Sequence, residues 1–220
     1  MTSPDGADPA RREGLGRSEA KRRAILDAAT EIFLRTGYLG ASMDEVAARA
    51  AVSKQTVYKH FDSKEALFIA IASRMTNEGS DRVQADVGEP AGAADLADFL
   101  TAYATKQLAV VLTPGLMQLR RLVIAEAGRF PELGRALHDG GPRRAMQALE
   151  RLFVRLAARG LLTLDDPAAA ASHFNWLIMG EPVSQVMLLG NDAIPDAAWQ
   201  ARHAASGVRV FLAAYGAPTP

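Results

Sequence analysis

The stretch SMDEVAARAAVSKQTVYKHFDSKEALF, residues 42–68, predicts two short helices separated by a three-residue turn and followed at once by a third helix. Residues 42–45, Ser-Met-Asp-Glu, form a capping box for the first helix. Ser53 is a good N-cap for the second, and residues 62–65, Asp-Ser-Lys-Glu, form a capping box for the third. Two short helices that share a small core match the helix-turn-helix motif, whose second helix enters the major groove of DNA.

The second short helix has a surface suited to a polyanion. It carries no acidic residue, and its polar side chains are Lys54, Gln55, Thr56, Tyr58, Lys59 and His60. We predict that Gln55 and Thr56 read base edges, because their amide and hydroxyl groups can pair with bases. Lys54 and Lys59 are expected to contact DNA, although an ordinary solvated helix face would look the same.

Further candidates lie at helix starts and on the preceding helix. Ser42, Ser53 and Lys64 stand where free N–H groups favour phosphate, a role compatible with plain capping. Arg17, Lys21 and Arg22 either follow the DNA backbone or enter the minor groove as an arm. The sequence leaves these two alternatives open.

The segment before residue 42 predicts a third helix of the same unit. Ile25, Ala28, Ala29, Ile32 and Phe33 repeat at helical spacing, which indicates an amphipathic helix from about residue 18 to residue 36. Gly37 follows where a left-handed residue commonly ends a helix. The three helices form a head joined to the helix that begins at Lys64.

Residues 18–70 resemble the DNA-binding domain of the TetR family of bacterial transcriptional regulators. The resemblance implies that Tyr58 and His60 touch phosphate or sugar; alternatively, Tyr58 caps the small core. Ala51 departs from the pattern, since the family usually has glycine there, and a left-handed alanine costs roughly 1 kcal/mol. The matching residues are Ile25, Ala28, Ala29, Phe33, Gly37, Tyr38, Ser42, Val46, Ala47, Val52, Ser53, Thr56, Tyr58, His60, Phe61, Lys64, Glu65 and Leu67.

Composition narrows the class of protein further. The chain is 220 residues long and carries 25 basic and 25 acidic side chains, so indiscriminate binding of polyanions is not expected. It has no cysteine, which excludes disulfides and thiolate metal sites, and we expect no cofactor and no metal. Residues 1–16 lack an apolar stretch and predict a disordered tail. No run of residues is apolar enough for us to expect a membrane span, and the absence of cysteine fits a cytoplasmic protein.

The rest of the chain also predicts helices, and the expected fold class is all-α. We expect an N-terminal helix-turn-helix head over residues 17–76 and a larger helical domain over residues 77–216, for which the resemblance implies effector binding and dimerisation. Proline and glycine mark the breaks. The expected helices are 94–112, 114–128, 131–138, 143–159, 166–189 and 196–214.

The last two helices are apolar on more than one side, which predicts burial against a partner. The resemblance implies a homodimer whose interface they form; a monomeric core is the alternative. A two-fold protein reads a pseudo-palindromic operator in double-stranded DNA. Pro182 is expected to free a backbone carbonyl within the first of these helices. The predicted interface residues are Met179, Val183, Val186, Met187, Trp199, Val208, Phe211 and Leu212.

The resemblance also implies an effector pocket in the larger domain, without identifying its lining. Large, soft or polar side chains on the middle helices are candidates, since pockets in helical bundles are mostly apolar with a few orienting polar groups. Arg121 or His173 could orient the ligand. The candidates are Tyr103, Gln107, Met117, Arg120, Arg121, Phe130, Met146, Phe153, His173, Phe174 and Trp176.

The sequence therefore predicts a repressor that a small-molecule effector releases from DNA. The alternatives are an activator, or a small-molecule carrier with a vestigial head. An enzyme is not expected, because there is no Ser-His-Asp signature, phosphate-binding glycine loop or metal-ligand spacing. The effector and the operator sequence stay open.

Overall fold

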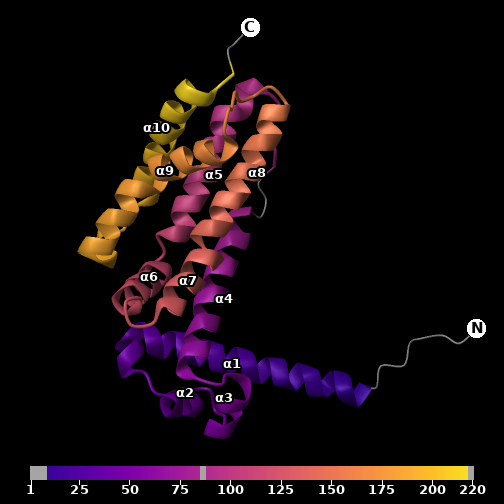
Figure 1. The fold of residues 1–220 in the computed structure, drawn as a ribbon, viewed down its shortest axis with the longest axis vertical. Coiled ribbons are helices and arrows are strands. Elements are labelled where there is room, and N and C mark those ends of the chain that lie inside the picture. The colour runs from indigo at the N-terminus through magenta and orange to yellow at the C-terminus, as the bar shows by residue number, and fades with distance from the viewer. Residues whose placement is uncertain (1–8, 85–87, 218–220) are drawn as a thin grey trace, which may run out of the picture. The chain divides into compact units, whose positions relative to one another are not determined.

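The computed structural model describes residues 9–84 and 88–217, and its fold class is all-α, as predicted (Figure 1). It divides into two compact units between Ile71 and Ala72, earlier than the predicted boundary at residue 76. The helices are α1 (Pro9–Gly40), α2 (Met43–Arg49), α3 (Lys54–His60), α4 (Lys64–Gln84), α5 (Ala93–Val111), α6 (Pro114–Glu126), α7 (Pro131–Gly140), α8 (Pro142–Ala158), α9 (Pro167–Leu189), the 3-10 turn η1 (Asn191–Ala193) and α10 (Ala197–Tyr215).

The first helix begins earlier than the sequence predicted. Residues 9–16 were assigned to a disordered tail, but the structure places them in α1. The run Ala-Arg-Arg-Glu at residues 10–13 consists of strong helix formers, which explains the extension beyond Gly14 and Gly16. Residues 1–8 of the predicted tail lie outside the described residues.

The head is held together by one apolar core. Ile25 and Phe33 of α1, Val46 of α2, Val57 of α3 and Leu67 of α4 are all buried. Each helix therefore turns one face inward, as the spacing predicted, and α3 is anchored through its middle residue. This anchoring fixes which face of α3 meets solvent.

The turn between α2 and α3 contains the strained residue that the sequence indicated. The N–H of Val52 donates to the carbonyl of Ala47 at 3.0 Å, and that of Ala51 to Ala48 at 3.2 Å. This pair of bonds is a Schellman motif, which places the residue after the cap in the left-handed region. Ala51 accordingly has φ of 53°, and it is the residue for which glycine was expected.

The predicted end of α1 is also visible in the backbone. Gly37 has φ of 79° and ψ of 172°, which interrupts the helical geometry inside the Pro9–Gly40 span. The positive φ matches the expectation, while the extended ψ differs from a left-handed helical residue. The chain is thus redirected before α2 begins.

The larger unit is a helical bundle in which α5, α8, α9 and α10 are the long members (Figure 1). Their bounds agree with the predicted helices to within one or two residues. Phe153, Phe174 and Phe211, from α8, α9 and α10, are fully buried with ring centroids 5.0–5.5 Å apart; Phe153 stacks on Phe211, and Phe174 meets both rings edge to face. At Gly207 a Cβ atom would lie 2.6 Å from the side chain of Ile178, so α10 approaches α9 more closely than alanine would allow.

Pro182 lies inside α9 and frees a carbonyl, as predicted. A residue with an N–H at position 182 would donate to the carbonyl of Ile178, four residues earlier. The Nε2 atom of His203 on α10 donates to that oxygen instead, at 3.0 Å. His203 is held by Trp199, whose ring stacks on it at a centroid distance of 4.7 Å. The proline therefore adds a polar link between α9 and α10.

Among the described residues, no single helix is long and apolar enough to cross a membrane. Only α5 and α6 taken together, a pair bent by 63°, meet that length and composition.

Candidate nucleic-acid interface and internal cavity

The outer face of α3 is open to solvent. Val57 is completely buried, whereas Lys54, Gln55, Tyr58 and Lys59 are exposed. Tyr58 leaves 43% of its surface accessible, so the alternative that it caps the head's core does not hold. Thr56 and His60 are half-buried at the edges of this face. We call the exposed side chains of Lys54, Gln55, Tyr58 and Lys59 the reading face.

The first turn of α3 is fixed by its cap. Ser53 accepts a hydrogen bond from the N–H of Thr56 at 3.1 Å, and the two hydroxyls lie 2.8 Å apart. Ser42 caps α2 in the same way by accepting from the N–H of Glu45 at 3.1 Å. Both predicted caps are confirmed. Each cap leaves other N–H groups at its helix start without an intrahelical partner, which suits an anion such as phosphate.

One cation of the reading face is already paired. Lys54 Nζ lies 2.8 Å from Asp44 Oδ1 on α2 and donates to Asp44 Oδ2 at 3.1 Å, and this hydrogen bond raises the pKa of Lys54. Both side chains are more than half exposed, so the pair adds little stability and can open when a phosphate competes for the ammonium group. Lys59 has no ion pair within the described residues.

Two further predicted DNA contacts are engaged with the head itself. Lys64 Nζ lies 4.8 Å above the Tyr38 ring and donates to the carbonyl of Leu39 at 3.3 Å. Arg22 is exposed, and its guanidinium lies 5.1 Å from the centre of the Phe61 ring. These cation–π contacts orient both charges, each being worth about 0.5–1 kcal/mol at an exposed site.

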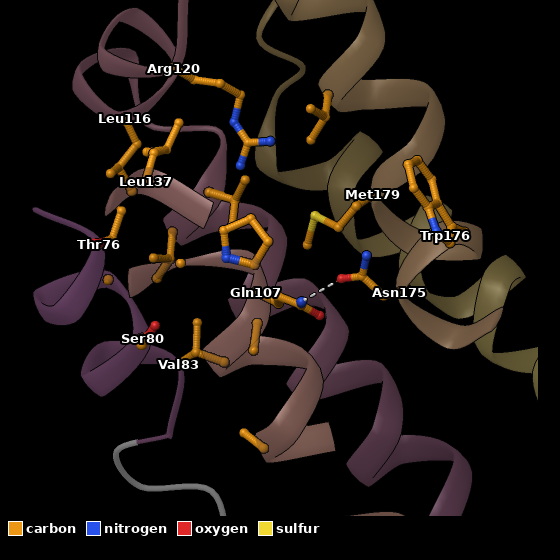
Figure 2. A pocket seen from close by; sticks show the side chains of 18 of the residues that line it. Thr76, Ser80, Val83, Gln107, Leu116, Arg120, Leu137, Asn175, Trp176 and Met179 are labelled. Atoms are coloured by element: carbon orange, nitrogen blue, oxygen red, sulfur yellow. Dashed lines mark hydrogen bonds between the residues drawn. The ribbon is translucent and has the colours of Figure 1, made fainter. Parts of the chain in front are cut away.

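The larger unit contains a cavity of about 390 Å³, within the range typical of small-molecule sites. Side chains from α4 to α9 line it, so it lies inside the bundle (Figure 2). Its walls are mainly apolar, and none of its lining residues is acidic. Representative wall residues are Val83, Val110, Leu116, Leu137, Met179 and Val183.

A few polar groups converge on this cavity. Gln107 is only 3% exposed; its Nε2 donates to Asn175 Oδ1 at 3.2 Å, while its Oε1 has no partner within the described residues (Figure 2). An unsatisfied buried acceptor costs about 1–3 kcal/mol. Burial raises the pKa of Tyr103 to about 12, so its hydroxyl stays protonated. Burial lowers the pKa of Arg120, which nonetheless remains a cation at neutral pH.

Only some of the predicted pocket residues line the cavity. Tyr103, Gln107 and Trp176 line it together with Arg120, which the sequence also indicated. Met117, Phe153 and Phe174 are completely buried in the core of the bundle and do not line the cavity, so their assignment was wrong. Large apolar side chains at helical spacing pack against neighbouring helices unless a void faces them, and the sequence does not reveal the void.

The two residues expected to orient a ligand have other partners. Arg121 donates to the carbonyl of Val186 at 3.1 Å and to Asn191 Oδ1 at 2.6 Å, which anchors the end of α9. His173 is exposed and its Nδ1 lies 2.5 Å from the Tyr215 hydroxyl. Phe130, just before α7, also lies outside the cavity. Successive helix positions differ by about 100°, which is why Arg120 faces inward when Arg121 does not.

Several lining residues were not predicted as such. Thr76, Ser80 and Val83 belong to α4, which the sequence predicted only as the helix joined to the head. Asn175 also lines the cavity, and a polar residue inside an apolar helix is a signal by which the sequence could have identified it. The distribution of these positions over separate helices hides them from any local pattern.

The predicted interface residues on α9 and α10 divide into three groups. Val186, Val208 and Phe211 are buried in the protomer's own core, so their assignment to an interface was wrong. Met179 and Val183 line the cavity. Met187, Trp199 and Leu212 are partly exposed. The most exposed apolar side chains here are Leu188 and Leu189, at 82% and 72%, and Val210, at 53%.

Comparison with known proteins places both units in one family. Residues 25–71 match the description "Bacterial regulatory proteins, tetR family", and residues 98–217 match "AefR-like transcriptional repressor, C-terminal domain". A TetR-family transcriptional regulator from Mesorhizobium loti is 38% identical, with a TM-score of 0.84, over 91% of this chain and 98% of that one. The flavonoid-responsive regulator FrrA is 29% identical, with a TM-score of 0.73, over 90% of this chain and 98% of that one.

A curated relative matches mainly in the head. The transcriptional activator FasR of Mycolicibacterium smegmatis is 47% identical over 56 residues, which make up 26% of this chain and 26% of FasR. The chain spans between 26% and 59% of the length of the curated relatives that it first matches. The match over residues 98–217 and the similarity to the Mesorhizobium structure carry the assignment: the chain belongs to the TetR family of bacterial transcriptional regulators.

Proposed function

We propose that this chain is a transcriptional repressor that binds a pseudo-palindromic DNA site as a homodimer and is released by a small molecule. The reading face of α3 is the observation that carries the proposal. Its exposed amide, phenol and ammonium groups project from a helix that is capped at Ser53 and anchored at Val57. Such groups on a short helix suit base edges and phosphates of the major groove.

Within the reading face the roles divide by chemistry. Gln55 carries an amide that can pair with adenine, and we assign it to base readout, with Thr56 beside it. Lys54 and Lys59 are assigned to phosphates, as are the helix starts at Ser42 and Ser53. Tyr58, His60, Lys64 and Arg22 complete the proposed DNA contacts; they support position along the backbone rather than sequence preference.

Control by a ligand follows from the two ends of α4. The helix begins at Lys64, within the head, and its later residues Thr76, Ser80 and Val83 line the cavity. A ligand that binds better to one position of α4 shifts the head accordingly, whereas equal affinity for both positions shifts nothing. A 100-fold loss of DNA affinity needs only ~2.7 kcal/mol of coupling.

The proposed dimer uses the exposed apolar side chains of α9 and α10. Leu188, Leu189 and Val210 are large apolar side chains exposed to solvent. Met187 and Leu212, on the same two helices, are partly exposed. Burying this patch against a second copy removes the cost of its exposure. Leu188→Glu is expected to yield monomers in analytical ultracentrifugation, whereas Val154→Glu on α8 should leave dimers intact. Monomers in the unmodified protein would contradict the proposal.

The direction of regulation rests on the C-terminal half. Residues 98–217 match a domain described as that of a transcriptional repressor, while the similarity to the activator FasR covers only 56 residues. Repression is therefore favoured. In vitro transcription from the bound promoter should fall as protein is added, and an increase would indicate activation instead.

Electrophoretic mobility shift with the promoter DNA flanking the protein's own gene tests DNA binding itself. We expect a shifted band that survives an excess of unrelated competitor DNA at moderate salt. A shift that unrelated DNA removes completely would leave only non-specific electrostatic binding, and the proposal would fail.

A further inference from the structure

The cavity of the larger unit contains a positive charge without a counter-charge. Arg120 of α6 is half-buried, and within the described residues it forms no ion pair or hydrogen bond. Figure 2 shows its guanidinium directed inward, among the lining side chains. None of the lining residues is an aspartate or glutamate. A desolvated cation of this kind is unfavourable until an anion joins it.

The absence of hydrogen-bond partners within the described residues is specific to Arg120 and is not shared by the neighbouring arginine. Arg121, on the same helix, uses its guanidinium to bond Val186 and Asn191 and has no role in the cavity. Arg120 has no such partners, so its planar fork of donors remains available. A guanidinium fork matches a carboxylate in two parallel, charge-assisted hydrogen bonds.

A second polar atom of the cavity also lacks a partner, and because it is an acceptor it needs a hydrogen-bond donor from the ligand. Gln107 Oε1 is a buried acceptor, while the other end of the same amide is occupied by Asn175. A ligand satisfies this oxygen with a donor such as a hydroxyl. The remaining wall is mainly apolar, so the body of the ligand between the two polar ends should be mainly apolar too.

We propose that the cavity binds an apolar organic acid, whose carboxylate pairs with Arg120 and whose hydroxyl donates to Gln107. This identification rests on the proposed effector-binding function and adds the chemical class of the effector. A cationic ligand would meet Arg120 with no acid to compensate it. A purely apolar ligand would exclude water from both Arg120 and Gln107 without replacing its hydrogen bonds.

Titration calorimetry with 10-hydroxydecanoate, its methyl ester and decanoate tests the proposal without DNA. The flexible chain lets both ends find their partners, so no fixed spacing is assumed. The unmodified protein should bind the acid at least about tenfold more tightly than the ester, because charge-assisted bonds are roughly twice as strong as neutral ones. Equal affinity for acid and ester, or no binding of any of the three, would overturn the proposal.

Two substitutions and one surface control test which residues cause these ligand preferences. Arg120→Met should abolish the advantage of the acid over the ester, whereas Arg135→Met, which removes an exposed arginine from α7, should preserve it. Gln107→Met should shift the preference from 10-hydroxydecanoate toward decanoate by about threefold or more. An acid preference that survives in Arg120→Met contradicts the assigned partner. The comparison of ligands on the unmodified protein stands even if a variant fails to fold.

The same protein preparation separates this proposal from the function on which it rests. If the protein shifts its specific DNA but binds none of the probes, the organic-acid proposal is wrong and the proposal of a DNA-binding regulator stands. If the probes show the expected preferences but none of them releases DNA, the proposed chemistry of the cavity stands and the proposed control of DNA binding by a ligand is wrong.

Discussion

The reading face of the head and the cavity of the larger unit arrange their recognition groups in opposite ways. In the head, the exposed groups belong to the single helix α3, and one buried residue, Val57, holds them in place. In the larger unit, the groups converge from α4 to α9 and face inward. Substitutions on the reading face should therefore alter binding with little effect on folding, whereas those in the packed core around the cavity should affect stability first.

The largest expected effect is on stability, and it distinguishes a residue of the packed core from a residue that lines the cavity. Phe174→Ala removes a fully buried ring that contacts Phe153 and Phe211, so the free energy of unfolding should fall by about 3–5 kcal/mol. Trp176→Ala, two residues away and mostly exposed, should cost less than about 1 kcal/mol. Urea denaturation measures both. A small loss for Phe174→Ala would mean that this ring borders empty space and belongs with the ligand site after all.

The next effect concerns the carbonyl freed by Pro182. His203→Leu leaves the Ile178 oxygen without its donor, which should cost about 1–3 kcal/mol. In a Pro182→Ala background the backbone N–H of residue 182 can bond that oxygen, so the same His203 substitution should cost less. This double-mutant cycle is read by thermal or chemical unfolding. Identical losses in both backgrounds would show that the histidine contributes only packing.

On the reading face we expect effects on binding alone. Gln55→Ala should relax the preference at one base position at a cost of ~1–3 kcal/mol, with unchanged stability. Lys59→Ala should weaken binding to all sequences alike and flatten the dependence of log K on log salt by about one unit. Fluorescence anisotropy over a salt series distinguishes the two. A new base preference in Lys59→Ala would remove that residue from the phosphate contacts.

The smallest effect tests the strained turn. Ala51→Gly should stabilise the head by about 0.5–1 kcal/mol, because alanine at φ of 53° is strained and glycine is not. Ala48→Gly, an exposed position inside α2, should destabilise it by about the same amount. Thermal unfolding of the two variants should thus move in opposite directions. Movement in the same direction would mean that the turn has no strain to relieve.

The head could be predicted from sequence because its signals are local. Ser42 and Ser53 cap their helices, and the position of Ala51 follows from the spacing between them. The α1 helix extended further than expected, since the polar composition of residues 9–16 was interpreted as a tail although it includes strong helix formers.

The cavity could be predicted only in part, because it depends on which helix faces meet. Nothing local distinguishes Arg120 from Arg121 or Phe174 from Trp176 until α6 and α9 are placed beside their neighbours. The same applies to Val186, Val208 and Phe211, which the sequence assigned to a partner and the bundle buries within the protomer. Apolar character predicts burial but not the surface that provides it.

Selection of bound fragments from a random oligonucleotide pool tests the central claim most directly, namely that the reading face of α3 reads DNA twice per symmetric dimer. We expect an inverted repeat whose half-sites are centred about 34–36 Å, or a multiple of that distance, apart along the duplex. The preference at one position of each half-site should disappear with Gln55→Ala. Recovery of fragments without any shared motif, or of a motif unaffected by that substitution, would contradict the account.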